Sequence, residues 1–114
     1  MMFRRMLVIA VSGMCVLPSL ALAAAPARML LIHGQQFEPQ ELSLPANTKI
    51  KLLIRNQDTL PAEFESYDLS REVLVPANGE ATVYVGPLEP GRYQFFNDFN
   101  RTMQGTVLVN TVGN

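Results

Sequence analysis

Proline is the residue that most limits the folds open to this chain. Six prolines are spread through its second half and middle, at positions 39, 45, 61, 76, 87 and 90. Because proline has no amide proton and its ring clashes with the preceding helical turn, each of them would break a helix. They interrupt every window that is long enough for a good helix, so the sequence predicts a chain built from strands.

Short runs in which apolar and polar residues alternate take the place of helices. Residues 48–55 are the clearest example, because Ile50, Leu52 and Ile54 would lie on one face of a strand and basic residues on the other. The runs that read as strands are residues 28–32, 41–44, 48–55, 63–67, 71–75, 80–85, 92–96 and 105–110. Turn-forming residues separate these runs. The sequence therefore predicts an all-β fold, a Greek-key β-sandwich of seven to eight strands.

Residues 1–25 differ from the rest and have the pattern of a secretory signal peptide. Two arginines form a basic start, residues 6–17 are almost wholly apolar, and small residues follow. Two Ala-x-Ala cleavage frames, ending at Ala23 and Ala25, stay open. An uncleaved membrane anchor is the alternative, but the apolar run is shorter than the roughly 20 residues that span a bilayer. We expect export to the periplasm and a single domain at residues 26–114.

Cysteine and charge limit the chemistry of the exported domain. The one cysteine of the chain, Cys15, lies in the apolar part of the signal, so the mature domain has no thiol and forms no disulfide. Without the signal, the domain keeps seven basic and ten acidic residues, a net charge near −3. This charge argues against binding to nucleic acid or to anionic membrane surfaces. We expect a mature form that is not inserted in a membrane.

The order of motifs between residues 37 and 109 resembles the cupredoxin superfamily. Phe37-Glu38-Pro39 opens this stretch, and the segment 60–64 lies in its middle. The end carries the most weight, with a Pro-Gly turn at 90–91, a Tyr-x-Phe strand at 93–95 and Met103-x-Gly105 before an alternating last strand. The resemblance implies a cupredoxin-like sandwich with a ligand loop before its last strand.

The residues that hold copper in blue-copper proteins are nearly all replaced in this chain. The shortest ligand loop of such proteins reads Cys-x-x-His-x-x-Met, and an earlier histidine completes the site. By this resemblance Asn97 stands at the cysteine, Asn100 at the second histidine and Glu63 at the first, and only Met103 is kept. A blue-copper centre needs a thiolate and two imidazoles. We therefore expect that the protein is not a blue-copper electron carrier.

A closer likeness is to the EfeO-type cupredoxin-like domains of periplasmic iron-uptake proteins and of small proteins beside iron permeases. Residues 56–66 and 86–99 carry this likeness. It implies a metal-binding accessory protein for iron or copper, with an iron permease or periplasmic iron-uptake proteins as partners. Members of this group usually have an acidic pair and then a histidine in the last loop, where this chain has Asn97-Asp98-Phe99-Asn100.

Five residues are candidate metal ligands. Glu63 and Glu65 are two apart in a strand, so their carboxylates would project on the same side and repel one another unless a cation relieves them. Asp98 adjoins the ligand loop, Met103 holds the axial position by the resemblance, and His33 joins them if its strand ends nearby. Carboxylates with one thioether suit ferrous iron, manganese or copper. Each residue also has an ordinary alternative role, as part of a solvated face, a core methionine or a surface histidine.

Two functions remain open on these grounds. In the first, a metal-binding accessory protein, Glu63, Asp98 and Met103 would converge on a common point. In the second, a metal-free protein-interaction module with a degenerate cupredoxin site, Asn97 and Asn100 would be committed to hydrogen bonds within the loop. We expect no enzyme, because the chain has no activated serine or thiol and no histidine paired in sequence with an acid.

Overall fold

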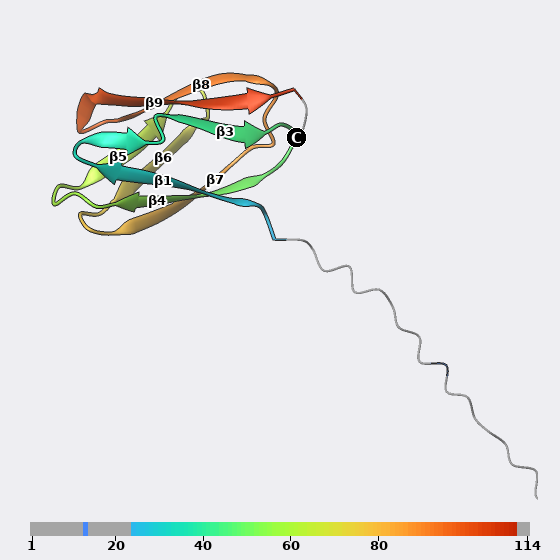
Figure 1. Cartoon of the computed structure of the whole chain (residues 1–114), viewed down its shortest axis with the longest axis horizontal. Helices are drawn as coiled ribbons and strands as arrows, with labels where there is room; N and C mark the ends of the chain where they lie inside the picture. Colours follow the sequence, from blue (N-terminus) through green and yellow to red (C-terminus); the bar gives the residue numbers. More distant parts are fainter. Residues whose placement is uncertain (1–12, 14–23, 112–114) are drawn as a thin grey trace, which may run out of the picture.

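The computed structural model describes Gly13 and residues 24–111, and every regular element in these residues is a β-strand (Figure 1). The strands are β1 (Ala27–His33), β2 (Gln36–Glu38), β3 (Glu41–Pro45), β4 (Ile50–Asn56), β5 (Ala62–Ser66), β6 (Arg71–Val75), β7 (Glu80–Val85), β8 (Gly91–Asn97) and β9 (Asn100–Asn110). The all-β prediction is confirmed, with more strands than the seven to eight expected, because β2 is too short to show alternation. The predicted signal peptide lies almost wholly outside the described residues, in which no helix is long and apolar enough to cross a membrane.

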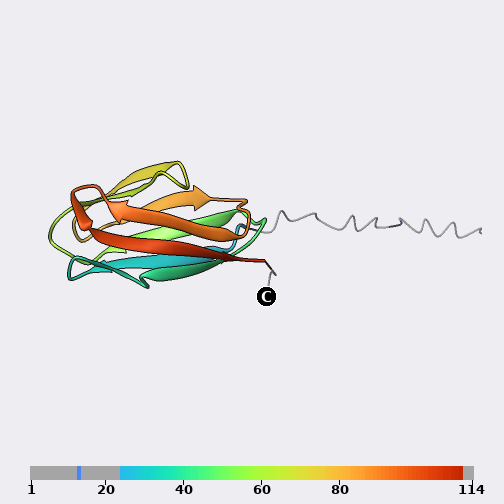
Figure 2. The same cartoon turned by 90° about the horizontal axis from the view of Figure 1, so that it is seen from above.

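The strands form two sheets that pack face to face as a sandwich (Figure 2). The four-stranded sheet has the order β2-β1-β4-β7, and the five-stranded sheet has the order β3-β9-β8-β5-β6. Neighbouring strands are antiparallel except for two parallel pairs, β1 with β4 and β3 with β9. The chain passes repeatedly from one sheet to the other, and this connectivity confirms the predicted Greek-key sandwich.

Apolar side chains on the facing sides of the two sheets form the core. Alternate residues of β4 are buried, as its sequence pattern predicts. Three aromatic rings meet near the centre of the core, with the Phe95 ring 4.9 Å from that of Phe37 and 5.2 Å from that of Phe64. A side chain at Gly105 would place its Cβ 2.3 Å from a Phe95 ring atom. Glycine is therefore required there for β9 to approach the aromatic cluster.

Hydrogen bonds tie together the turns at one end of the sandwich. This end, on the left of Figure 1, carries the turns after β1, after β4 and between β8 and β9. The Asp58 carboxylate accepts the backbone N–H groups of Gly34 and Gln35, each at 2.8 Å. The backbone N–H of Asp98 donates to the carbonyl of Glu63 at 2.9 Å. These links fix the end of the sandwich at which the turn between β8 and β9 lies.

Candidate functional site

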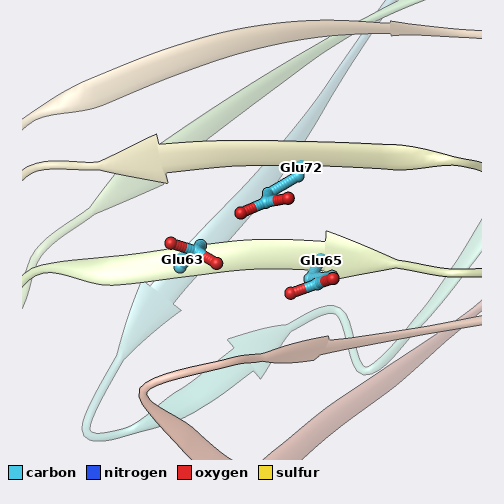
Figure 3. A group of neighbouring side chains, drawn as sticks. All are labelled: Glu63, Glu65 and Glu72. Carbon is cyan, nitrogen blue, oxygen red and sulfur yellow. The ribbon is translucent and has the colours of Figure 1, made fainter.

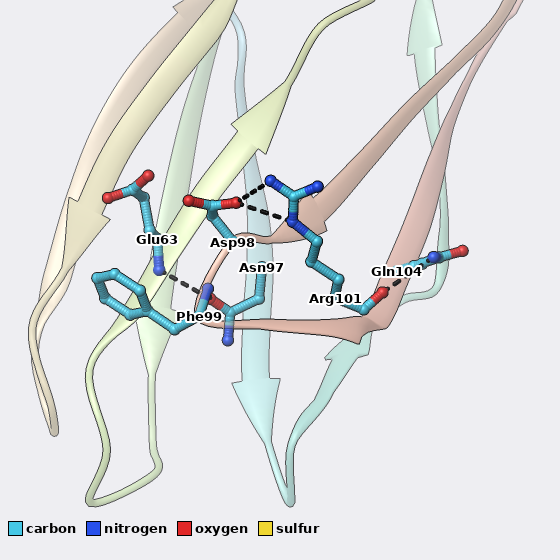
Figure 4. Close-up of polar contacts among 6 residues, drawn as sticks. All are labelled: Glu63, Asn97, Asp98, Phe99, Arg101 and Gln104. Atoms are coloured by element: carbon cyan, nitrogen blue, oxygen red, sulfur yellow. Dashed lines mark hydrogen bonds and ion pairs between the residues drawn. The ribbon is translucent and has the colours of Figure 1, made fainter.

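Asn97 lies at the end of β8, where the resemblance to blue-copper proteins places a cysteine. The residue is 2% exposed. Its amide oxygen accepts the backbone N–H groups of Glu63 at 2.9 Å and Phe99 at 3.1 Å (Figure 4). Its amide nitrogen donates to the sulfur of Met103 at 3.5 Å. Both lone pairs of the amide oxygen are therefore engaged within the protein and not directed at an ion.

Asn100 and Met103, the other two loop positions, are also committed within the structure. The Asn100 amide oxygen accepts the hydroxyl of Thr102 at 2.7 Å, and its amide nitrogen donates to the side-chain oxygen of Gln35 at 3.4 Å. Met103 is 3% exposed and packs in the core cluster. The loop hydrogen bonds are those expected for a degenerate cupredoxin site.

Glu63 and Met103, predicted to converge, lie on opposite faces of the five-stranded sheet. In β5 the side chains of Ala62, Phe64 and Ser66 are buried, and the two glutamates between them are half-buried on the outer face. Met103 points the other way, into the core. The geometry therefore does not bring the thioether and the carboxylates together around one ion.

Asp98 lies near the two glutamates but has a basic partner of its own, whereas His33 belongs to the other sheet. The Asp98 carboxylate pairs with Arg101, whose Nη2 lies at 2.8 Å and whose Nε lies at 3.1 Å from the same oxygen (Figure 4). His33 is exposed at the end of β1, in the four-stranded sheet. Of the predicted ligands, the structure gathers only Glu63 and Glu65 into a common group.

A third carboxylate completes this group. Glu72 lies directly opposite Glu65 in the antiparallel pairing of β5 with β6, and Glu63 is the diagonal neighbour (Figure 3). One carboxylate oxygen from each residue lies within 4.8 Å of the others. Among the described residues, these three are the side chains of the usual ligand types (Asp, Glu, His and Cys) that lie close enough together to hold a metal ion. Sequence reasoning missed Glu72, although a tight β5–β6 hairpin would have predicted its register opposite Glu65.

The three carboxylates crowd negative charge onto one patch of the sheet. A hydrogen bond shared with Glu72 raises the pKa of Glu63 above its ordinary value, and desolvation and repulsion from Glu72, Asp98 and Glu65 add to this. Desolvation raises the pKa of Glu65, repulsion from Glu72 and Asp98 adds to the rise, and Arg101 opposes it. Within residues 24–111, none of the three carboxylates has a salt-bridge partner. A cation bound between them would remove this repulsion.

The donor set decides which ion suits this patch, named here the carboxylate triad (Glu63, Glu65 and Glu72). Its ligands are all oxygen atoms on half-buried or exposed side chains. Carboxylate oxygens suit Mg²⁺, Ca²⁺, Mn²⁺ and iron, whereas Cu(I) prefers thiolate and thioether sulfur. The triad fits an oxygen-preferring cation, and the residues around Asn97 do not fit a blue-copper centre.

The fold and the site together define a two-sheet β-sandwich with a buried asparagine, Asn97, at the end of β8. The model of the cupredoxin-like domain family matches residues 5–109, and the chain belongs to this family. A protein of Rickettsia prowazekii (strain Madrid E), called an uncharacterized protein, is 40% identical over 82 residues. That alignment covers 71% of this chain and 66% of the relative, so the chain spans just under two thirds of the relative's length.

Solved structures share the fold at low sequence identity. The metal-binding domain of the Cu(I)-exporting P-type ATPase CopA of Streptococcus pneumoniae D39, determined with Cu(I), has a TM-score of 0.66 and 13% identity, over 74% of this chain and 84% of that chain. Auracyanin A, a blue copper protein of Chloroflexus aurantiacus, has a TM-score of 0.64 and 15% identity, over 76% and 100%. The fold is thus related to that of copper-binding proteins.

Proposed function

We propose that the protein is an exported metal-binding accessory protein that holds an oxygen-preferring cation, iron first, on the carboxylate triad. The observation that carries this proposal is the triad itself. Three carboxylate oxygens, one from each of Glu63, Glu65 and Glu72, lie within 4.8 Å of one another and have no basic partner in the described part of the chain. Such a group is electrostatically unfavourable until a cation neutralises it.

We propose that the protein acts in the periplasm, beside an iron permease or periplasmic iron-uptake proteins. The signal-peptide pattern of residues 1–25 supports export. The likeness of residues 56–66 and 86–99 to the EfeO-type domains supports the connection with iron. Copper is the second metal to test, because structural neighbours of this fold bind it. We propose binding without catalysis, since the group consists of carboxylates alone and lies on the open outer face of the sheet.

The test is metal titration of the mature protein with matched variants. Mn²⁺, followed by electron paramagnetic resonance, is an oxygen-preferring probe, and Fe²⁺ under nitrogen and Cu(I) are compared with it. Single substitutions Glu63→Gln, Glu65→Gln and Glu72→Gln should each weaken Mn²⁺ and Fe²⁺ binding about tenfold or more, as loss of a first ligand does. Glu89→Gln removes the same charge from an exposed turn and should leave the affinity within about twofold.

Two results would refute the proposal. One is the lack of binding tighter than millimolar for each of the three metals. The other is an equal loss in Glu89→Gln and the triad variants, which would show diffuse charge attraction and no site.

A metal-free interaction module is the second candidate function. The observation that favours it is the engagement of Asn97 and Asn100 in internal hydrogen bonds, since the loop between β8 and β9 then serves only the fold. Failure of the metal titration with an intact fold would favour this candidate.

A further inference from the structure

The outer face of the five-stranded sheet is not covered by any other element in the described residues. The inner face packs against the four-stranded sheet, and the outer face carries the carboxylate triad on β5 and β6. Leu74 on β6 is 56% exposed beside Glu63, its partner in the strand register. The face therefore combines acidic groups with exposed apolar surface.

Tyr67, which directly follows β5, is an exposed aromatic residue on this face. It is 66% exposed, and its ring lies edge-on to that of Phe96 with 5.3 Å between the centroids. Two open hollows share Tyr67 as a wall. The first, of about 300 Å³, is lined by Glu65, Ser66, Tyr67, Ser70, Arg71 and Glu72. The second, of about 290 Å³, is lined by Tyr67, Asp68, Gln94 and Phe96.

The molecule already shows how a guanidinium group binds to this face. The guanidinium carbon of Arg101 lies 5.3 Å from the centroid of the Phe96 ring, and its nitrogens contact the Asp98 carboxylate. An aromatic ring and a carboxylate together thus hold one cationic side chain, as cation–π and charge attraction predict. In the first hollow, Tyr67 and two triad carboxylates offer the same pair of features.

The basic residue nearest to that hollow does not fill it. Arg71 lines the hollow, but its guanidinium donates to the backbone carbonyls of Tyr84 at 2.7 Å and Ser70 at 2.9 Å. Glu65 and Glu72 have no salt-bridge partner in the described part of the chain. The hollow thus has a ring and two carboxylates, and neither carboxylate forms a salt bridge with Arg71 or with Arg101.

Charge on the molecule is divided between its two outer faces. The outer face of the five-stranded sheet bears the triad and Asp98, with Arg101 paired to Asp98 and Arg92 of β8 paired to Glu41 of β3. Exposed lysine and arginine side chains of β4, such as Lys51 and Arg55, belong to the opposite sheet. A partner approaching the acidic face is therefore favoured when it is basic and repelled when it is acidic.

We propose that this face docks a partner protein through a segment that presents arginine or lysine. One basic side chain enters the first hollow, over the Tyr67 ring and against Glu65 and Glu72, while Leu74 contributes apolar contact. Charge complementarity selects this occupant. The docking needs no bound ion, so it can be tested separately from the proposed metal site.

A peptide titration tests this docking face. The probe is a short fluorescein-labelled peptide of alternating arginine and serine, and a glutamate–serine peptide of equal length is the comparison. With ¹⁵N-labelled mature protein, the arginine peptide should shift the amide signals of residues 65–72 and 94–96, and the acidic peptide should not. Tyr67→Ala should lower the affinity about fivefold, the value of one exposed cation–π contact. Glu89→Gln, which removes a charge elsewhere, should change it less than about twofold.

The outcomes separate docking from metal binding. Tyr67→Ala removes no ligand of the triad, so its Mn²⁺ affinity should be that of the unchanged protein. Metal binding with no arginine-peptide binding would overturn the docking proposal alone. Amide shifts spread over all acidic residues, or equal losses in Tyr67→Ala and Glu89→Gln, would overturn it as well, because both show unspecific charge attraction.

Discussion

Replacing Asn97 by alanine tests the claim that this residue serves the fold in the place of a metal ligand. The substitution removes the acceptor of two backbone N–H groups, those of Glu63 at 2.9 Å and Phe99 at 3.1 Å, and the donor to the Met103 sulfur. The side chain is 2% exposed, so water does not readily replace it. A buried N–H group without a partner costs about 1–3 kcal/mol.

The expected loss in the free energy of unfolding is therefore about 2–4 kcal/mol for Asn97→Ala, since two such donors are orphaned. In a domain of this size each kcal/mol corresponds to about 4–8 °C, so the melting temperature should fall by about 8–32 °C. Urea unfolding followed by circular dichroism measures the free energy directly. Asn100→Ala is the matched control, because that side chain is half-buried and accepts one exposed hydroxyl, and it should cost below about 1 kcal/mol. Equal losses in the two variants would refute the reasoning.

Two further predictions concern the core and the triad. Gly105→Ala should destabilise the domain by about 3 kcal/mol in urea unfolding, because its Cβ would lie 2.3 Å from the Phe95 ring; a loss below about 0.5 kcal/mol would show that the ring moves freely. Glu72→Gln should raise the urea midpoint at neutral pH and have no such effect below the ordinary glutamate pKa of 4.5. The sign follows from Glu63: its pKa is raised in the folded protein, so its contribution to stability is complete below the ordinary value and is lost as pH rises through the raised one. A midpoint that rises equally at both pH values would contradict this origin.

Much of the fold could be predicted because its strands carry their burial in the sequence. The alternation in β4 and the prolines that exclude helices are local features of the sequence. Their effect on the backbone does not depend on distant parts of the chain. The strand β2 was missed because three residues show no period. β9 also begins at Asn100, well before the alternating run that predicted it, since its pairing with β8 continues past a register shift at Phe96 and Asn97.

The candidate site was predicted only in part, and the reason is the parity of the strands. Glu63 and Glu65 lie on one face, as expected, and form a group with Glu72. The prediction that Glu63 and Met103 converge came from the resemblance to the ligand loop of blue-copper proteins, not from the strand pattern. The alternation itself places Phe64 inward and Glu63 outward, so the outward position of Glu63 could be read from the sequence. The Glu72 register, by contrast, depends on the length of the β5–β6 turn, which the sequence does not state directly.

The proposed carboxylate site differs from a buried blue-copper centre in what it would do with an ion. A buried thiolate site holds its metal firmly and tunes a redox couple, whereas half-buried carboxylates release an ion readily and are screened by salt. Glu65 and Glu72 belong both to the triad and to the hollow beside Tyr67. Because one carboxylate cannot fully neutralise an ion and a guanidinium at the same time, a basic partner that docks there would weaken the hold on the ion. An exposed site beside a docking surface thus suits handing an ion over, and such a handover needs no electron transfer.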